Sequence, residues 1–103
     1  MSDITTTPKT KTETRTKPSR PHMHRVILLN DDYTPREFVI TVLQAVFRMS
    51  PAQANGVMLA AHQRGVCVVA VYTREVAETK AAQGTEMGQR EGYPLTFTTQ
   101  PED

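Results

Sequence analysis

Only the part of this chain that follows Pro21 contains enough apolar side chains to form a hydrophobic core. Residues 1–21 include seven Thr and three Pro, with Met1 and Ile4 as their apolar side chains, whereas 37 of the 82 residues in 22–103 are apolar. So little apolar surface cannot offset the entropy of ordering the backbone, and the prolines discourage helix. We therefore predict a disordered N-terminal extension over 1–21 and one folded domain over 22–103.

The size and charge of this domain exclude several classes of protein. A domain of 82 residues buries about 60–65% of its unfolded surface, which allows one small core and no separate cofactor and substrate domains. The extension has a net charge of +3 and the domain −2, which argues against a strong nucleic-acid binder. No apolar run approaches the roughly 18–20 residues that span a bilayer, and the polar start is unlike a signal peptide. We expect a cytoplasmic protein, and its single cysteine, Cys67, is consistent with a reducing compartment.

Apolar periodicity predicts the element order β-α-α-β-α-β. Strands are expected at 22–29, 66–72 and 93–98, and the second of these is expected to be central because it is apolar throughout. Helices are expected from Thr34, from Ser50 to Arg64, and from Thr73. The third of these is expected to include Met87 and to fade through Gly84 and Gly88 toward Gly92. The predicted class is α+β, with a three-stranded antiparallel sheet packed against three helices.

The starts of the first two helices carry capping signals. Thr34 is expected to cap the first helix, with Pro35 at its first position and Glu37 completing a capping box. Ser50 and Gln53 repeat this pattern, and Gly65 is expected to close the second helix in the left-handed conformation. The apolar residues expected to form the core-facing stripe of the first helix are Phe38, Val39, Val42, Leu43, Ala45, Val46 and Met49.

A polar triplet, Asn30-Asp31-Asp32, follows the first strand and is the first candidate for a functional site. On the second helix, Met58 and His62 are four residues apart and can project from one face. Both features also have ordinary structural explanations, because Asn and Asp favour turns and a single helix histidine is more often a packed or surface residue than a ligand. The residues by themselves favour the structural explanation.

Within residues 24–97 the chain contains, in this order, VILLNDDYTPREFVITVLQAVF, VMLAAHQRG, VYTREVAETK and YPLTF. Together these segments resemble the ClpS family, the adaptor proteins of the bacterial Clp protease. The resemblance implies a protein with no catalytic residues, no cofactor and no metal. It also implies that the chain recognises proteins whose first residue is bulky and hydrophobic, the N-end rule degrons, and delivers them to a hexameric AAA+ Clp unfoldase for degradation. We expect a monomer that binds neither nucleic acid nor membrane.

The resemblance also implies which residues bind each partner. The substrate's free α-amino group is expected to bind Asn30, Asp32 and His62, with Asp31 in a supporting or partly overlapping role in the same α-amino site. The pocket for the first side chain is expected to be lined by Leu29, Thr34, Arg36, Val39, Met58, Ala61 and Leu95. Glu75 and Lys80 match positions that contact the N-terminal domain of the unfoldase, although exposed helix charges need no function of their own.

Two pocket positions depart from the family pattern. Arg36 stands where many relatives carry Met, and Ala61 where many carry Val. The smaller Ala61 enlarges one wall, while the aliphatic stem of Arg36 can still cover the pocket with its guanidinium in water. We therefore expect aromatic first residues to remain preferred and Leu to bind more weakly than in relatives with Met and Val.

Other functions have weaker support in the sequence. A ribosome- or RNA-associated binding module is the main alternative, because small domains of this kind occur there and the extension is basic, but six aromatic residues and a negative domain offer little for RNA. His22 and His24 could share a strand face and hold a metal if a third ligand joined them. Cys67 with His62 and an Asp could form a nucleophilic triad, but Cys67 lies in the most apolar segment and has no evident activating group.

Overall fold

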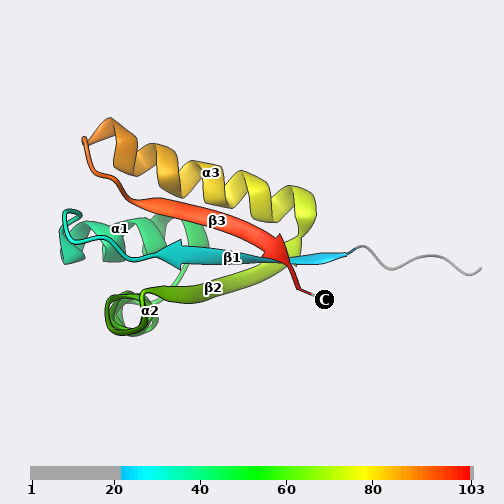
Figure 1. Cartoon of the computed structure of the whole chain (residues 1–103), viewed down its shortest axis with the longest axis horizontal. Coiled ribbons are helices and arrows are strands. Elements are labelled where there is room, and N and C mark those ends of the chain that lie inside the picture. The colour runs from blue at the N-terminus through cyan, green and yellow to red at the C-terminus, as the bar shows by residue number, and fades with distance from the viewer. Residues whose placement is uncertain (1–21, 103) are drawn as a thin grey trace, which may run out of the picture.

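The computed structural model describes residues 22–102, so the prediction of disorder for residues 1–21 falls outside the described part of the chain. The elements follow the predicted order: β1 (Met23–Leu29), α1 (Arg36–Phe47), α2 (Pro51–Arg64), β2 (Val66–Thr73), α3 (Arg74–Arg90) and β3 (Thr96–Pro101). Figure 1 shows α3 running along β3 and α2 lying near the start of β2. Among these helices, none is long and apolar enough to cross a membrane. The predicted α+β class is confirmed.

The sheet has the strand order β2-β1-β3, and both pairs are antiparallel. The expectation that residues 66–72 form the central strand is therefore wrong, because β1 is central and β2 lies at an edge. Ile27 of β1 pairs with Val68, whose side chain is 48% exposed, whereas Leu28 pairs with Cys67 and Phe97 on the core side. The helices cover only one face of the sheet. The residues of β2 that point to the other face are therefore exposed although they are apolar.

Helix α1 packs its apolar stripe into the core, with two departures from the predicted set, the first being Met49, which lies beyond the end of the helix at Phe47. Its buried residues are Val39, Val42, Leu43, Val46 and Phe47. Phe47 replaces Ala45, which is exposed, so that part of the prediction is wrong. The reason is a contact made across the fold, because the rings of Phe47 and Phe97 lie 5.3 Å apart and draw position 47 inward.

The predicted start of α2 is confirmed and that of α1 is wrong. The Ser50 hydroxyl accepts from the Gln53 backbone N–H, the Gln53 side chain accepts from the Ser50 N–H, and Gly65 closes the helix at φ 89°. Helix α1 begins at Arg36 after Pro35, with no side-chain cap. Thr34 does not cap it because its hydroxyl and its backbone N–H bond to Asp31.

Helix α3 ends at Arg90, close to the expected end near Gly92, but it stays regular through Gly84 and Gly88, where we expected it to fade. These glycines let the helix approach the next strand closely. A Cβ on Gly84 would lie 2.7 Å from the Phe97 ring, and one on Gly88 would lie 2.8 Å from the Cβ of Leu95. This close packing stabilises the helix and compensates for the low helix propensity of glycine. The following strand begins at Thr96, three residues later than predicted.

Candidate functional site

A pocket lies at the end of the sheet where β1 stops. The chain leaves Leu29, turns through residues 30–35 and enters α1, while the last turns of α2 and Leu95 complete the wall. In Figure 1 this end lies opposite the end where β1 begins and where the C-terminus is marked. The cavity volume is about 340 Å³. This volume lies near the lower end of the range of small-molecule sites, about 300–1,000 Å³, and suits a single side chain better than a large ligand.

All the residues that the sequence suggested for substrate binding line this pocket. They are Leu29, Asn30, Asp31, Asp32, Thr34, Arg36, Val39, Met58, Ala61, His62 and Leu95. Three lining residues were missed, namely Leu28, Tyr33 and Pro35. Tyr33 and Pro35 could have been included because they alternate with selected residues of the same loop, whereas Leu28 is a core strand residue that nothing in the sequence marks out.

Asp31 organises the loop that forms one wall of the pocket. Its Oδ1 accepts hydrogen bonds from the backbone N–H groups of Tyr33, at 2.9 Å, and Thr34, at 2.7 Å. Its Oδ2 accepts from the Thr34 hydroxyl at 2.9 Å. Such short-range bonds from an Asp side chain are the usual means of fixing a turn. With both oxygens engaged within the loop, Asp31 has less capacity for a ligand than its neighbours.

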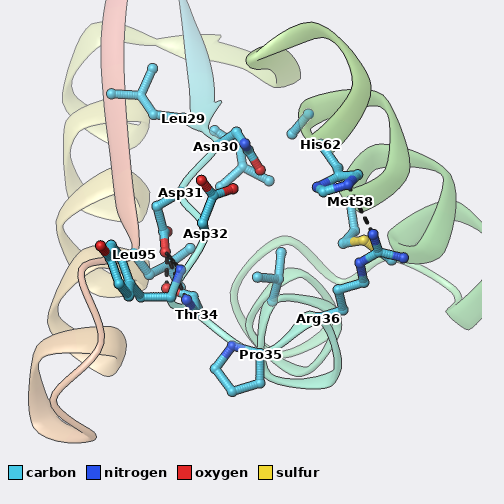
Figure 2. Close-up of a pocket in the computed structure, with 14 residues that line it drawn as sticks. Leu29, Asn30, Asp31, Asp32, Thr34, Pro35, Arg36, Met58, His62 and Leu95 are labelled. Atoms are coloured by element: carbon cyan, nitrogen blue, oxygen red, sulfur yellow. Dashed lines mark hydrogen bonds between the residues drawn. The ribbon is translucent and has the colours of Figure 1, made fainter.

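Asn30 and Asp32 present their side chains at the pocket opening. The backbone N–H of Asn30 donates to the carbonyl of Gly65 at 2.9 Å, which ties the loop to the end of α2. Both side chains are exposed, and within residues 22–102 neither has a hydrogen-bond partner. Figure 2 shows them on the side of the opening that faces His62. The opening therefore offers an amide oxygen and a carboxylate that are available to accept hydrogen bonds.

His62, near the end of α2, is held by Arg36, the first residue of α1. A guanidinium nitrogen of Arg36 lies 2.9 Å from Nε2 of His62 (Figure 2). Because guanidinium can only donate, Nε2 must be the acceptor and the imidazole is neutral, with its proton on Nδ1. The contact joins the two helices at the rim of the pocket, where both side chains are exposed.

Below this polar rim the pocket is apolar. Val39, Met58, Ala61 and Leu95 are between 1% and 8% exposed, so they form a rigid floor that belongs to the hydrophobic core. Leu95 is additionally fixed by Gly88, whose missing side chain lets α3 press against it. The pocket can therefore take up an apolar group in its interior while binding a polar or charged group at its mouth.

A second predicted site lies on α3, where Glu75 and Lys80 border a shallow depression of about 420 Å³. Glu75 is exposed. Lys80 is partly buried, and its Nζ donates to the backbone oxygen of Val46 at 2.9 Å and lies 5.7 Å from the centre of the Tyr72 ring. Lys80 therefore has a structural role in addition to any role in binding a partner.

The weaker sequence candidates do not assemble into a site in the described structure. Cys67 is partly buried, and desolvation raises the pKa of its thiol, with a smaller lowering from the charge of Arg64. A raised pKa favours the unreactive protonated form at neutral pH. His24 is buried in the sheet and His22 is exposed, and residues 22–102 contain no group of three or more potential metal ligands.

The chain is similar over most of its length to proteins of one known family. A family model described as the ATP-dependent Clp protease adaptor protein ClpS matches residues 19–98. The curated ClpS 1 adapter of Rhodopseudomonas palustris is 60% identical over 103 residues, and that of Bradyrhizobium diazoefficiens 59%, each match covering 100% of both chains. Among solved structures, Agrobacterium tumefaciens ClpS2 bound to L-phenylalaninamide is similar with a TM-score of 0.80 and 57% identity, over 81% of this chain and 100% of that one.

Proposed function

Because the chain belongs to the ClpS family of ATP-dependent Clp protease adaptors, and so is an adaptor without catalytic activity, we propose that its pocket binds the N-terminal residue of proteins destined for degradation. The solved relative from A. tumefaciens carries L-phenylalaninamide, which has a free α-amino group and an aromatic side chain. Both parts of such a ligand find suitable surroundings in the pocket described above. Family membership also favours an adaptor over an RNA-associated module.

The α-amino group is proposed to bind Asn30, Asp32 and His62 at the pocket mouth. An α-amino group with an ordinary pKa of about 8 is mostly protonated at neutral pH and presents three donors. Asn30 Oδ1, the Asp32 carboxylate and the unprotonated imidazole nitrogen of His62 offer matching acceptors around one opening. Hydrogen bonds that involve a charged group contribute about 1.5–3 kcal/mol each. Asp31 supports this arrangement by fixing the loop.

The first side chain is proposed to occupy the apolar floor. Burial of a Phe or Leu side chain contributes a further ~1.5–3 kcal/mol. The remaining predicted lining residues, Leu29, Thr34 and Arg36, also line this pocket. An internal Phe lacks the ammonium group, and a polar first residue would leave its own polar atoms unpaired in the pocket. Selectivity for bulky hydrophobic N-termini follows from requiring both interactions.

The observation that carries this proposal is the pair of unpaired acceptors, the Asn30 amide oxygen and the Asp32 carboxylate, which lie beside His62 above a buried apolar floor. We would measure the affinity of Phe-first, Leu-first and Ile-first peptides and of an N-acetylated Phe peptide. Acetylation removes the charge and two donors, so it should abolish binding while leaving the ring unchanged. Undiminished binding of the acetylated peptide would rule out recognition of the α-amino group. Among the free N-termini, Phe should bind more tightly than Leu, because Ala61 widens the pocket, and Leu equal to Phe would contradict this ranking.

The protein partner is proposed to be the N-terminal domain of a Clp AAA+ unfoldase, bound through Glu75 and Lys80. Their shared depression on α3 has no lining residue in common with the pocket, which supports simultaneous binding of the peptide and the unfoldase by one monomer. A cytoplasmic location belongs to the same proposal.

The adaptor domain is assigned to 22–103, and residues 1–21 are proposed to act in transfer of the substrate. Deletion of 1–21 should preserve peptide binding and impair degradation by the protease, and normal degradation would refute this role.

A further inference from the structure

The hydrogen bond between Arg36 and His62 uses an acceptor that the proposed function also needs. A neutral imidazole has one nitrogen with a free lone pair, while the other carries the proton and can only donate. In this structure the lone pair of Nε2 accepts from the Arg36 guanidinium at 2.9 Å. While that bond exists, neither ring nitrogen of His62 can accept a hydrogen bond from an ammonium group.

Peptide binding and the Arg36–His62 bond are therefore mutually exclusive at His62. Building on the proposed function, we propose that Arg36 is a specificity-determining residue that leaves His62 when an N-terminus binds, and that the released guanidinium selects N-termini whose second residue is acidic. Arg36 can make this exchange because its side chain is exposed and within residues 22–102 has no ion-pair partner to hold it. Its position at the start of α1 keeps it at the rim after release.

The second residue of a bound peptide can lie within reach of Arg36. The ammonium group and the guanidinium compete for one nitrogen, so each lies within about 3 Å of it when bound, and their binding positions are separated by no more than about 6 Å. Consecutive Cα atoms are about 3.8 Å apart, which places the second side chain within reach of the guanidinium. A carboxylate there would pair with Arg36.

The positive charges of Arg36 and of the peptide's ammonium group also favour an acidic second residue. Two cations at this separation repel each other, so a bare ammonium is disfavoured beside Arg36 and a neighbouring carboxylate offsets the repulsion. The protein's own carboxylates at the rim are committed elsewhere, because Asp31 is bonded within the loop and Asp32 is proposed to hold the ammonium. A carboxylate supplied by the peptide is therefore the available partner. Since exposed ion pairs are weak, the preference should be about two- to fivefold in affinity.

The test compares three peptides that begin Phe-Asp, Phe-Asn and Phe-Lys and are otherwise identical. The wild-type protein should bind them in that order of decreasing affinity, with differences that shrink in high salt. In Arg36→Met the order should collapse, and Phe-Asn should bind more tightly than it does to the wild type because the competitor for His62 is gone. Arg90→Met is the matched control, since it removes the same charge from an exposed position on α3 and should leave the order intact.

Nitrogen-15 NMR of the His62 imidazole provides a second readout that a merely structural role of Arg36 would not change. In the free wild-type protein Nδ1 should carry the proton, and the nitrogen-15 chemical shift of Nε2 should be that of a hydrogen-bonded acceptor. This chemical shift should change in Arg36→Met, and it should change in the wild type when the Phe-Asn peptide is added. Equal second-residue preferences in wild type and Arg36→Met would overturn the inference and leave the proposed function intact. If none of the three Phe-first peptides bound to the wild type or to Arg36→Met, both this inference and the proposed function would be overturned.

Discussion

Lys80 on α3 donates a hydrogen bond from Nζ to the backbone oxygen of Val46, 2.9 Å away in the last turn of α1. Carbonyls at a helix C-terminus lack partners within the helix and carry partial negative charge, so a cation there is favourable. Lys80→Met keeps most of the side chain but loses this bond and the contact with the Tyr72 ring. We expect the free energy of unfolding to fall by about 1–2 kcal/mol, measured by urea denaturation. An unchanged stability would show that the bond contributes nothing.

Glu75 offers a cleaner test of the proposed unfoldase interface. Its side chain is exposed and, in the described part of the chain, has no hydrogen-bond or ion-pair partner. Glu75→Lys should weaken binding to the unfoldase N-terminal domain at least tenfold, because a reversed charge at an interface is repulsive. Stability and peptide affinity should remain as in the wild type.

Lys80→Glu should abolish the same complex and should preserve peptide binding in the protein that folds. An unchanged affinity for the unfoldase in both variants would contradict the assignment of Glu75 and Lys80 to the interface.

Gly88 sets the position of Leu95 in the pocket floor. An added Cβ would lie 2.8 Å from the Cβ of Leu95, an atom close to the backbone that cannot rotate away. Gly88→Ala should therefore destabilise the protein by about 1–3 kcal/mol and weaken binding of Phe-first peptides by displacing the floor. Gly56→Ala is the control, because a Cβ at that exposed position of α2 meets nothing within 4 Å. There alanine should stabilise by about 0.5–1 kcal/mol, and equal effects of the two substitutions would exclude steric packing as the cause.

The sequence predicted the elements of this fold well and their arrangement less well. Features determined locally were found, such as the capping box of Ser50 and Gln53 and the left-handed Gly65. Features determined by distant contacts were not. The edge position of β2, the inward turn of Phe47 and the passage of α3 through Gly84 depend on which elements pack together, and no local pattern contains that information.

The candidate site shows the same division. Family resemblance brought eleven residues to one pocket because it carries long-range information that periodicity lacks. The pairing of Arg36 with His62 could not be predicted, since the two residues are 26 positions apart on different helices. The role of Thr34 could not be predicted either. Its position in the sequence is equally typical of a helix cap before α1 and of a turn fixed by Asp31, and the structure shows the turn.

The thiol of Cys67 gives a prediction about pH. Burial raises its pKa more than the charge of Arg64 lowers it, so the thiolate should form only above the ordinary cysteine range. The rate of alkylation by iodoacetamide should therefore reach half its maximum at a pH above about 8.5, the value for a free thiol. In urea, where the burial is lost, the midpoint should fall toward that value. A midpoint below about 8.5 in the native protein would mean that an activating group lies near the sulfur.

Asp31 and Asp32 are adjacent carboxylates with different surroundings, and the same substitution should separate their roles. Asp31→Asn replaces one of the oxygens that accept from Tyr33 and Thr34 with a donor. It should lower the free energy of unfolding by about 1–3 kcal/mol, because one or more of these donors loses its partner.

Asp32 is exposed, and within residues 22–102 its carboxylate has no partner to lose. Asp32→Asn should therefore leave stability unchanged and weaken the binding of Phe-first peptides about five- to tenfold, because an ammonium–carboxylate ion pair becomes an ammonium hydrogen bond to a neutral amide. Calorimetric titration with one peptide and urea denaturation of both variants make the comparison. If Asp32→Asn bound the peptide as tightly as the wild type, the ammonium would have to be held by Asn30 and His62 without this carboxylate.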